Sequence, residues 1–78
     1  MHLKDAQTGD ICVVEKLNLP ADLEHRLEAL GMTTGTEVSV LARKGRGIMI
    51  IKLRGTRFAL GYNITRNIEV WEVKGNGK

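Results

Sequence analysis

Three side chains able to bind a metal ion recur within one short stretch of the sequence: Asp22, His25 and Glu28. If this stretch is helical, the spacing places them on roughly one helix face, and carboxylate and imidazole groups are suitable Fe(II) ligands. A three-residue spacing drifts around a helix, however, and charged residues are the ordinary occupants of its polar face. We therefore predict no metal site and no cofactor here.

Residues for catalysis are sparse. Ser39 is the sole serine and falls within a predicted strand, so the sequence offers no serine–histidine pair. The stretch Gly45-Arg46-Gly47 lacks the length, the lysine and the following helix of a phosphate-binding P-loop. Cys12 is the single cysteine, which excludes an internal disulfide and a multi-cysteine metal site. We predict that the chain is not an enzyme and that it acts by binding.

The charges divide along the chain. Residues 1–42 carry three basic and seven acidic side chains, a net charge of −4. Residues 43–66 carry no acidic side chain and have a net charge of +7, from Arg43, Lys44, Arg46, Lys52, Arg54, Arg57 and Arg66. Such a basic segment can steer a nucleic acid, a membrane surface or an acidic protein, although it can equally be the solvated face of a strand pair.

An early helix is the first element that must position these residues. Residues 11–17 alternate in β-branched and other apolar side chains and predict a strand. Leu19-Pro20-Ala21-Asp22 then opens a helix, since proline fits a first turn. Leu23, Leu27 and Leu30 recur at helical spacing and predict a stripe that docks the helix on the sheet. Gly31 ends the helix, because glycine enters the left-handed conformation without strain.

The rest of the sequence predicts strands joined by tight turns. Glycines and short polar turns separate four further strands, which we place at residues 37–42, 48–54, 57–60 and 68–73. Residues 63–67 form a short connection with room for one helical turn. Five short strands hide their edges best by curling into a small barrel, with the helix covering an open side. The tail from about Lys74 is expected to be loose.

A chain of 78 residues allows one small domain, and we predict a single domain over residues 1–78. The longest apolar run covers residues 48–51, far short of the roughly 20 residues that cross a bilayer. The first residues, Met1-His2-Leu3-Lys4-Asp5, include no apolar stretch typical of a signal peptide. The chain is therefore expected in the cytoplasm.

Residues 26–38, RLEALGMTTGTEV, resemble the "RL…LG(L/M)…GT.V.V" segment of the ferrous iron transport protein A family. Gly9-Asp10 agrees with the family's "G(D/E)", Phe58-Ala59-Leu60 with its "lAL" and Ile68-Glu69-Val70 with its "I.V". The resemblance covers roughly residues 3–73. Residues 43–47 depart from it, because many members carry a longer loop with "GDP" there, and residues 61–65 replace an acidic, alanine-rich turn.

The resemblance implies an SH3-like barrel and an accessory role in ferrous iron uptake. The implied partner is the membrane transporter ferrous iron transport protein B, which carries a GTP-binding domain on the cytosolic side, and the chain would reach the membrane only through this partner. The same fold is also the C-terminal domain of iron-dependent repressors. The alternative is therefore a stand-alone SH3-like domain that binds nucleic acid or acts in iron-dependent transcription regulation.

Two groups of residues are predicted to contact the partner. An apolar cleft beside the helix would be lined by Leu19, Leu23 and Met32, and Arg26 would pair with Asp22, with Glu24 or with an acidic partner. The second group is the basic turn, Arg43, Lys44 and Arg46. An exposed strand edge would also support a homo-oligomer.

Two partner classes are disfavoured by composition. Nucleic acid is disfavoured because single strands are bound on exposed aromatic side chains. The chain has only Phe58, Tyr62 and Trp71, and Phe58 is expected to face the core. A membrane surface is disfavoured because the polar face of the helix carries acids instead of lysines.

Overall fold

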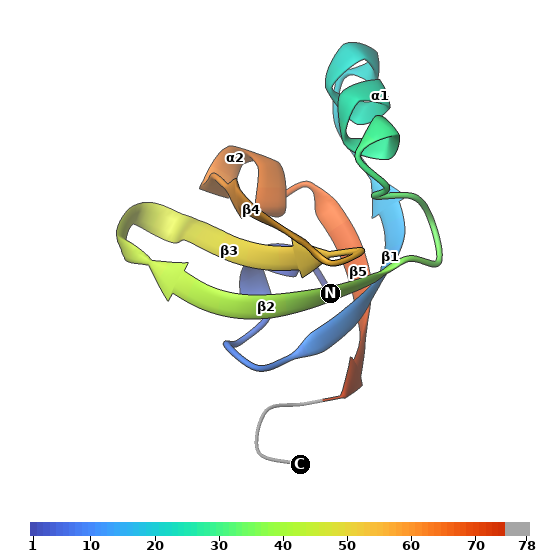
Figure 1. Ribbon diagram of the computed structural model, residues 1–78. Helices are drawn as coiled ribbons and strands as arrows, with labels where there is room; N and C mark the ends of the chain where they lie inside the picture. The colour runs from blue at the N-terminus through green and yellow to red at the C-terminus, as the bar shows by residue number, and fades with distance from the viewer. Residues whose placement is uncertain (75–78) are drawn as a thin grey trace.

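The computed structural model describes residues 1–74 and shows a mostly β protein with one antiparallel sheet. The strands are β1 (Ile11–Leu17), β2 (Glu37–Lys44), β3 (Ile48–Leu53), β4 (Thr56–Leu60) and β5 (Ile68–Lys74). Their order in the sheet is β4-β3-β2-β1-β5. The helices are α1 (Ala21–Ala29), between β1 and β2, and α2 (Tyr62–Thr65), with short 3-10 turns at Leu3–Asp5 and Gly45–Gly47. These elements confirm the predicted fold class (Figure 1).

The core lies on one side of the curled sheet. Alternate residues of each strand face inward, as the period of two in a strand requires. In β1, Cys12 and Val14 are buried while Ile11 and Val13 are only half-buried. The most completely buried apolar side chains include Leu3, Met32, Val38, Val40, Met49, Ile51, Leu53, Ile68 and Val70. Val73, predicted as an apolar member of the last strand, is instead 57% exposed because it lies at the outer end of β5.

The sheet curls without closing into a complete barrel. β4 and β5 are the two edges of the sheet order. Part of the β5 edge is covered by the first residues of the chain, since Val70 donates its backbone N–H to the Met1 carbonyl at 2.8 Å and His2 bridges to Glu69. Leu3 follows and inserts its side chain into the core, where it is fully buried. The N-terminal segment thus takes over the edge protection that barrel closure was expected to supply.

Helix α1 ends as the sequence predicts. Gly31 has φ 107°, and its N–H donates to the Glu28 carbonyl at 2.9 Å. The N–H of Met32 donates to the Leu27 carbonyl at 3.0 Å. These two bonds form a Schellman motif, which satisfies carbonyls that the helix end leaves open. Leu27 and Met32, the apolar pair that accompanies the motif, are both buried.

The helix does not cover the sheet, which corrects the sequence prediction. Figure 1 shows α1 projecting from the end of the molecule above β1 instead of lying on a sheet face. Leu27 is the buried residue of α1, whereas Leu30 is 48% exposed. The chain leaves the helix at Gly31, so Met32 takes the inward position that the periodicity assigned to Leu30.

The last segments agree with the sequence except at the tail. The single helical turn predicted for residues 63–67 is present as α2, one residue earlier. Lys74 is the final residue of β5, and the rest of the predicted loose tail, residues 75–78, lies outside the described residues. Within residues 1–74, no helix is long and apolar enough to span a bilayer.

Candidate partner-binding surface

The predicted apolar cleft beside α1 divides into a buried and an accessible part. Met32 is 1% exposed, so its side chain belongs to the core and cannot line a cleft for a partner. Leu19, the residue before Pro20, is half-buried and packs against the core. Leu23 is half-buried, and Leu30 is largely exposed. We call Leu19, Leu23, Arg26 and Leu30 the helix surface.

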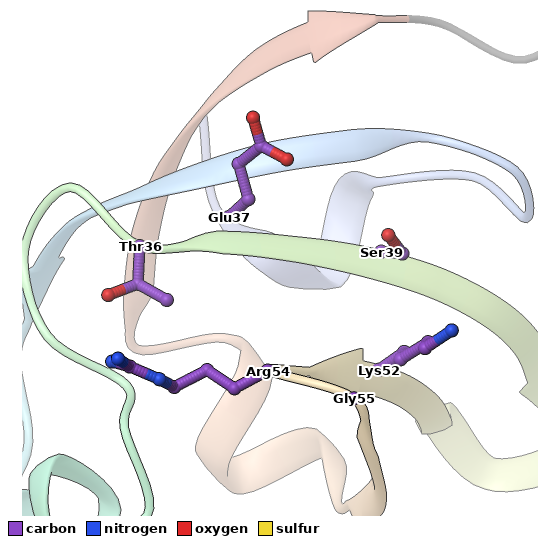
Figure 2. Close-up of a pocket in the computed structure, with 6 residues that line it drawn as sticks. All are labelled: Thr36, Glu37, Ser39, Lys52, Arg54 and Gly55. Carbon is purple, nitrogen blue, oxygen red and sulfur yellow. The ribbon is translucent and has the colours of Figure 1, made fainter.

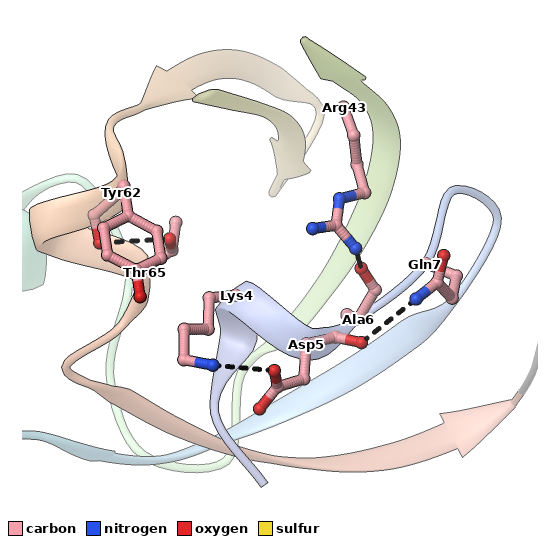
Figure 3. Close-up of polar contacts among 7 residues, drawn as sticks. All are labelled: Lys4, Asp5, Ala6, Gln7, Arg43, Tyr62 and Thr65. Carbon is pink, nitrogen blue, oxygen red and sulfur yellow. Dashed lines mark hydrogen bonds and ion pairs between the residues drawn. The ribbon is translucent and has the colours of Figure 1, made fainter. Parts of the chain in front are cut away.

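Arg26 extends from the helix surface without an acidic partner of its own. Lys4 and Asp5 form an ion pair at 2.8 Å (Figure 3), and no ion pair joins Arg26 to an acidic side chain of residues 1–73. The predicted intrahelical pairing of Arg26 with Asp22 or Glu24 is therefore absent from the structure, and the Arg26 side chain is exposed. An exposed guanidinium beside apolar side chains can bind a carboxylate in a bidentate manner.

The predicted basic turn lies at another part of the molecule. Arg43 donates from its guanidinium to the Ala6 carbonyl at 2.9 Å, which fixes it against the N-terminal segment (Figure 3). Lys44 and Arg46 are exposed, and Arg46 has φ 67° at the tip of the β2–β3 connection. Figure 1 shows this tip far from α1. The structure thus separates the predicted contact residues into two surfaces.

The structure also brings together residues that sequence analysis did not group. A depression of about 350 Å³ is lined by Thr36, Glu37, Ser39, Lys52, Arg54 and Gly55 (Figure 2). These residues come from the beginning of β2, the end of β3 and the turn between β3 and β4. The excess of basic residues from 43 to 66 was visible in the sequence, but strand register decides which of them are neighbours.

One of the three aromatic side chains faces the core, and the other two are exposed. Phe58 is half-buried and packs against the core. Tyr62 is 45% exposed and Trp71 is 51% exposed, and the Arg66 guanidinium lies 5.7 Å from the centre of the Tyr62 ring. The exposed Trp71 stands opposite Val13 in the β1–β5 ladder.

The candidate metal ligands do not form a cluster. Within residues 1–74, no group of three or more His, Cys, Asp or Glu side chains is placed to hold a metal ion. Cys12 is fully buried, and burial together with the Asp10 and Glu72 carboxylates raises the pKa of its thiol to about 11. The thiolate is the form of cysteine that reacts and binds metals, so Cys12 acts here as a core residue.

Comparisons with solved structures extend this description. A FeoA protein from Chlorobium tepidum superposes with a TM-score of 0.88 at 23% identity, over 97% of this chain and 73% of that one. Zinc-complexed FeoA from Stenotrophomonas maltophilia gives 0.76 at 29% identity, over 90% and 88% of the two chains. That protein is described as an SH3 domain protein and a candidate activating factor of ferrous iron transport.

A different kind of protein shares the fold. A manganese-dependent transcriptional repressor superposes with a TM-score of 0.83 at 19% identity, over 94% of this chain but 41% of the repressor. At this identity the likeness shows the fold alone.

Sequence comparison identifies the family. A search among curated proteins found no match. The model of the FeoA domain family matches residues 1–71, which include every residue of the Arg26–Val38 segment and all of the sheet except the end of β5. The order of glycines, leucines and strands that suggested this family is thus matched over nearly the whole chain, which belongs to the FeoA domain family.

Proposed function

We propose that this chain is an accessory of ferrous iron uptake that works on the cytosolic side of the membrane. It binds the cytosolic region of the membrane transporter, ferrous iron transport protein B, and performs no chemistry of its own. Membership of the FeoA family, which is associated with ferrous iron transport, supports this function. The description of the Stenotrophomonas maltophilia relative as a candidate transport activating factor also supports it.

The observation that carries the proposal is the projecting helix. A helix of nine residues is marginal in water unless its apolar side is packed. Here Leu27 anchors α1, while Leu23 and Leu30 keep much of their surface outside the core. A partner that covers the helix surface would bury this apolar area and could pair with Arg26. The helix surface is therefore the contact that we assign to the transporter.

The test is direct binding between the full chain and the isolated cytosolic GTP-binding region of the transporter from the same organism. We expect Leu23→Gln to weaken binding at least about tenfold, because truncating a contact at the centre of an interface costs more than about 1 kcal/mol. Leu41→Gln is the matched control, since Leu41 is a 37% exposed leucine in β2. Circular dichroism would show that both variants fold.

Two results would contradict the proposal. One is unchanged binding of the Leu23→Gln variant, and the other is equal weakening by Leu23→Gln and Leu41→Gln. A pull-down from detergent-solubilised membranes, with this chain as bait, provides a second readout. Recovery of ribosomal material or nucleic acid in place of a transporter with a GTP-binding domain would favour the nucleic-acid alternative.

A further inference from the structure

The depression between β2, β3 and the β3–β4 turn has cationic side chains in its lining. Lys52 and Arg54 line it, and both side chains are exposed. Arg57 stands directly opposite Lys52 in the β3–β4 ladder. Like charges at directly opposed positions of an antiparallel pair repel each other. Lys52 and Arg57 are therefore held close together at a cost to the sheet, and Arg54 is the second cation of the depression.

Neither Lys52, Arg54 nor Arg57 forms an ion pair with an acidic side chain of residues 1–73. Glu37 is the acidic residue among those that line the depression. Figure 2 shows its carboxylate pointing away from the Lys52 and Arg54 side chains. The Ser39 hydroxyl completes the polar lining, whereas the Thr36 hydroxyl shares a hydrogen bond with that of Thr33 at 2.9 Å. The depression thus presents positive charge together with hydrogen-bond donors.

Arg54 is held in place by its backbone and by its aliphatic stem. It has φ 52° in a two-residue turn with Gly55, at φ 84°, a geometry in which asparagine or aspartate would be usual. Its side chain crosses Gly31 so closely that a Cβ there would overlap the Arg54 Cδ. An arginine in this strained position carries its guanidinium to a fixed place beside the depression.

The directions of the cationic groups indicate the shape of the ligand. In Figure 2 the Arg54 side chain, from the β3–β4 turn, and the Lys52 side chain, from β3, point in opposite directions, with Thr36 above the first and Ser39 near the second. Groups that diverge in this way cannot both enclose a single phosphate. They match two carboxylates spaced along an extended chain. The outer face continues beyond Lys52 to the half-buried Ile50, opposite Ala59, which offers an apolar contact for an intervening side chain.

We propose that this depression binds an extended acidic segment of a protein partner, with carboxylates at Lys52 and Arg54. This inference rests on the proposed function only in taking the partner to be a protein. A polyphosphate chain such as nucleic acid is disfavoured, because Glu37 at the margin would face continuous negative charge. The depression borders the end of α1, where Arg54 lies against Gly31, but its residues differ from those of the helix surface, so different variants test the two proposals.

The experiment is an NMR titration of the ¹⁵N-labelled full chain with a capped oligoglutamate peptide. A capped oligoglutamine peptide of equal length is the uncharged control. We expect saturable shifts at the amides of residues 36–39 and 52–57 with the acidic peptide alone. Raising the salt to about 150 mM should weaken binding, because the contacts are exposed charges.

Two variants test the assigned residues. Arg54→Asn removes the guanidinium and places a favoured residue in the turn, so a binding loss cannot come from a broken turn. Lys52→Ala removes the second cation. Each should weaken oligoglutamate binding about fivefold, in line with single exposed ion pairs. The control is Lys16→Ala, which removes the same charge from an exposed position in β1; it should leave binding nearly unchanged.

Three outcomes would overturn the proposal. These are the absence of saturable shifts, equal weakening by Lys52→Ala and Lys16→Ala, and tighter binding of an oligothymidylate at the same amides. The last would make the depression a nucleic-acid site. If the full chain binds oligoglutamate but does not bind the transporter, the result counts against the proposed function alone. If the full chain binds the transporter but does not bind oligoglutamate, the result counts against the acidic-segment site alone.

Discussion

Gly31 and Arg54 join two parts of the chain that local sequence does not connect. Gly31 closes helix α1 with φ 107°, and the Arg54 stem lies against it from the β3–β4 turn. A side chain at residue 31 would therefore cause two separate problems. It would place an L-residue in the left-handed region, and it would displace Arg54.

A series of glycine substitutions separates these two effects. Gly31→Ala should lower the free energy of unfolding by about 2–3 kcal/mol, from left-handed strain plus displacement of the stem. Gly35→Ala, at φ 91° with open space around it, should cost about 1 kcal/mol from strain alone. Gly45→Ala, with open space and no positive φ, should change stability by less than about 0.5 kcal/mol. Urea denaturation measures all three.

The contact itself is tested by a double-mutant cycle. In an Arg54→Asn background the cost of Gly31→Ala should fall by about 1 kcal/mol, because the stem that it displaces is gone. Additive effects of the two substitutions would show that Gly31 and Arg54 do not interact.

Cys12 makes the free energy of unfolding depend on pH in the alkaline range. The folded thiol has its pKa raised to about 11, because it is buried near two carboxylates. The unfolded thiol ionises at lower pH and so binds fewer protons than the folded state between roughly pH 9 and pH 11. The free energy of unfolding should therefore fall across this range, by roughly 2–3 kcal/mol at its end.

The comparison that isolates this effect is the pH slope of Cys12→Ala. Other groups titrate above pH 9 in both proteins, so their contribution cancels in the difference of slopes. We expect the wild-type slope to be the steeper one. The wild-type thiol should also resist alkylation in native protein at neutral pH and react after unfolding. Equal slopes, or rapid alkylation of the native protein, would contradict this assignment.

The leucines of helix α1 predict an apolar stripe but do not predict where the helix lies on the molecule. Leu27 is buried, whereas Leu30 is half in solvent. The Schellman motif turns the chain at Gly31 and directs Met32 inward, so the stripe ends one turn early. An apolar side chain is thus left on a surface where a partner can cover it.

The two leucines should respond differently to truncation. Leu27→Ala should destabilise the protein by about 2–4 kcal/mol, because it removes a 7% exposed side chain that anchors the helix. Leu30→Ala should cost less than about 0.5 kcal/mol, because the side chain is 48% exposed. Thermal and urea unfolding provide the measurement. A comparable cost for both would mean that α1 packs on the sheet in solution.

At the scale of the whole molecule, stability is expected to be uneven. The sheet is linked across β1 and β2 by bonds such as that from the Val40 N–H to the Asp10 carbonyl, at 3.0 Å. The N-terminal segment adds Leu3 to the same core. Helix α1 contributes only Leu27 to this core and otherwise projects from it (Figure 1). Local opening of α1 therefore exposes little core surface and should be the easiest opening of the described elements.

Native-state hydrogen exchange measures this difference. The interior amides of α1 should exchange at least about ten times faster than those of Val40 and Ile51, which lie in the central strands. Partner binding to the helix surface should slow exchange in α1 and leave the central strands unchanged. If free α1 were as well protected as β2, the helix would be an integral part of the folded core.

Much of the fold could be predicted because its signals are local. Alternation of β-branched residues located β1, β2, β3 and β5 to within about two residues. Glycines located the turns, and Gly31 ended α1 as predicted. The family resemblance followed from the same local residues. The candidate site was less predictable, since Met32, which was predicted to line the cleft, proved buried.

The sequence by itself therefore determined the elements, their order and the family, because strand period, turn glycines and helix capping act within a few residues. The tertiary structure alone decided that α1 projects, that Leu30 stays exposed and that the N-terminal segment covers part of the β5 edge. It also decided that Lys52 and Arg54 line one depression, with Arg57 opposite Lys52 in the ladder. These features depend on strand register and on contacts between distant segments, which no local pattern encodes.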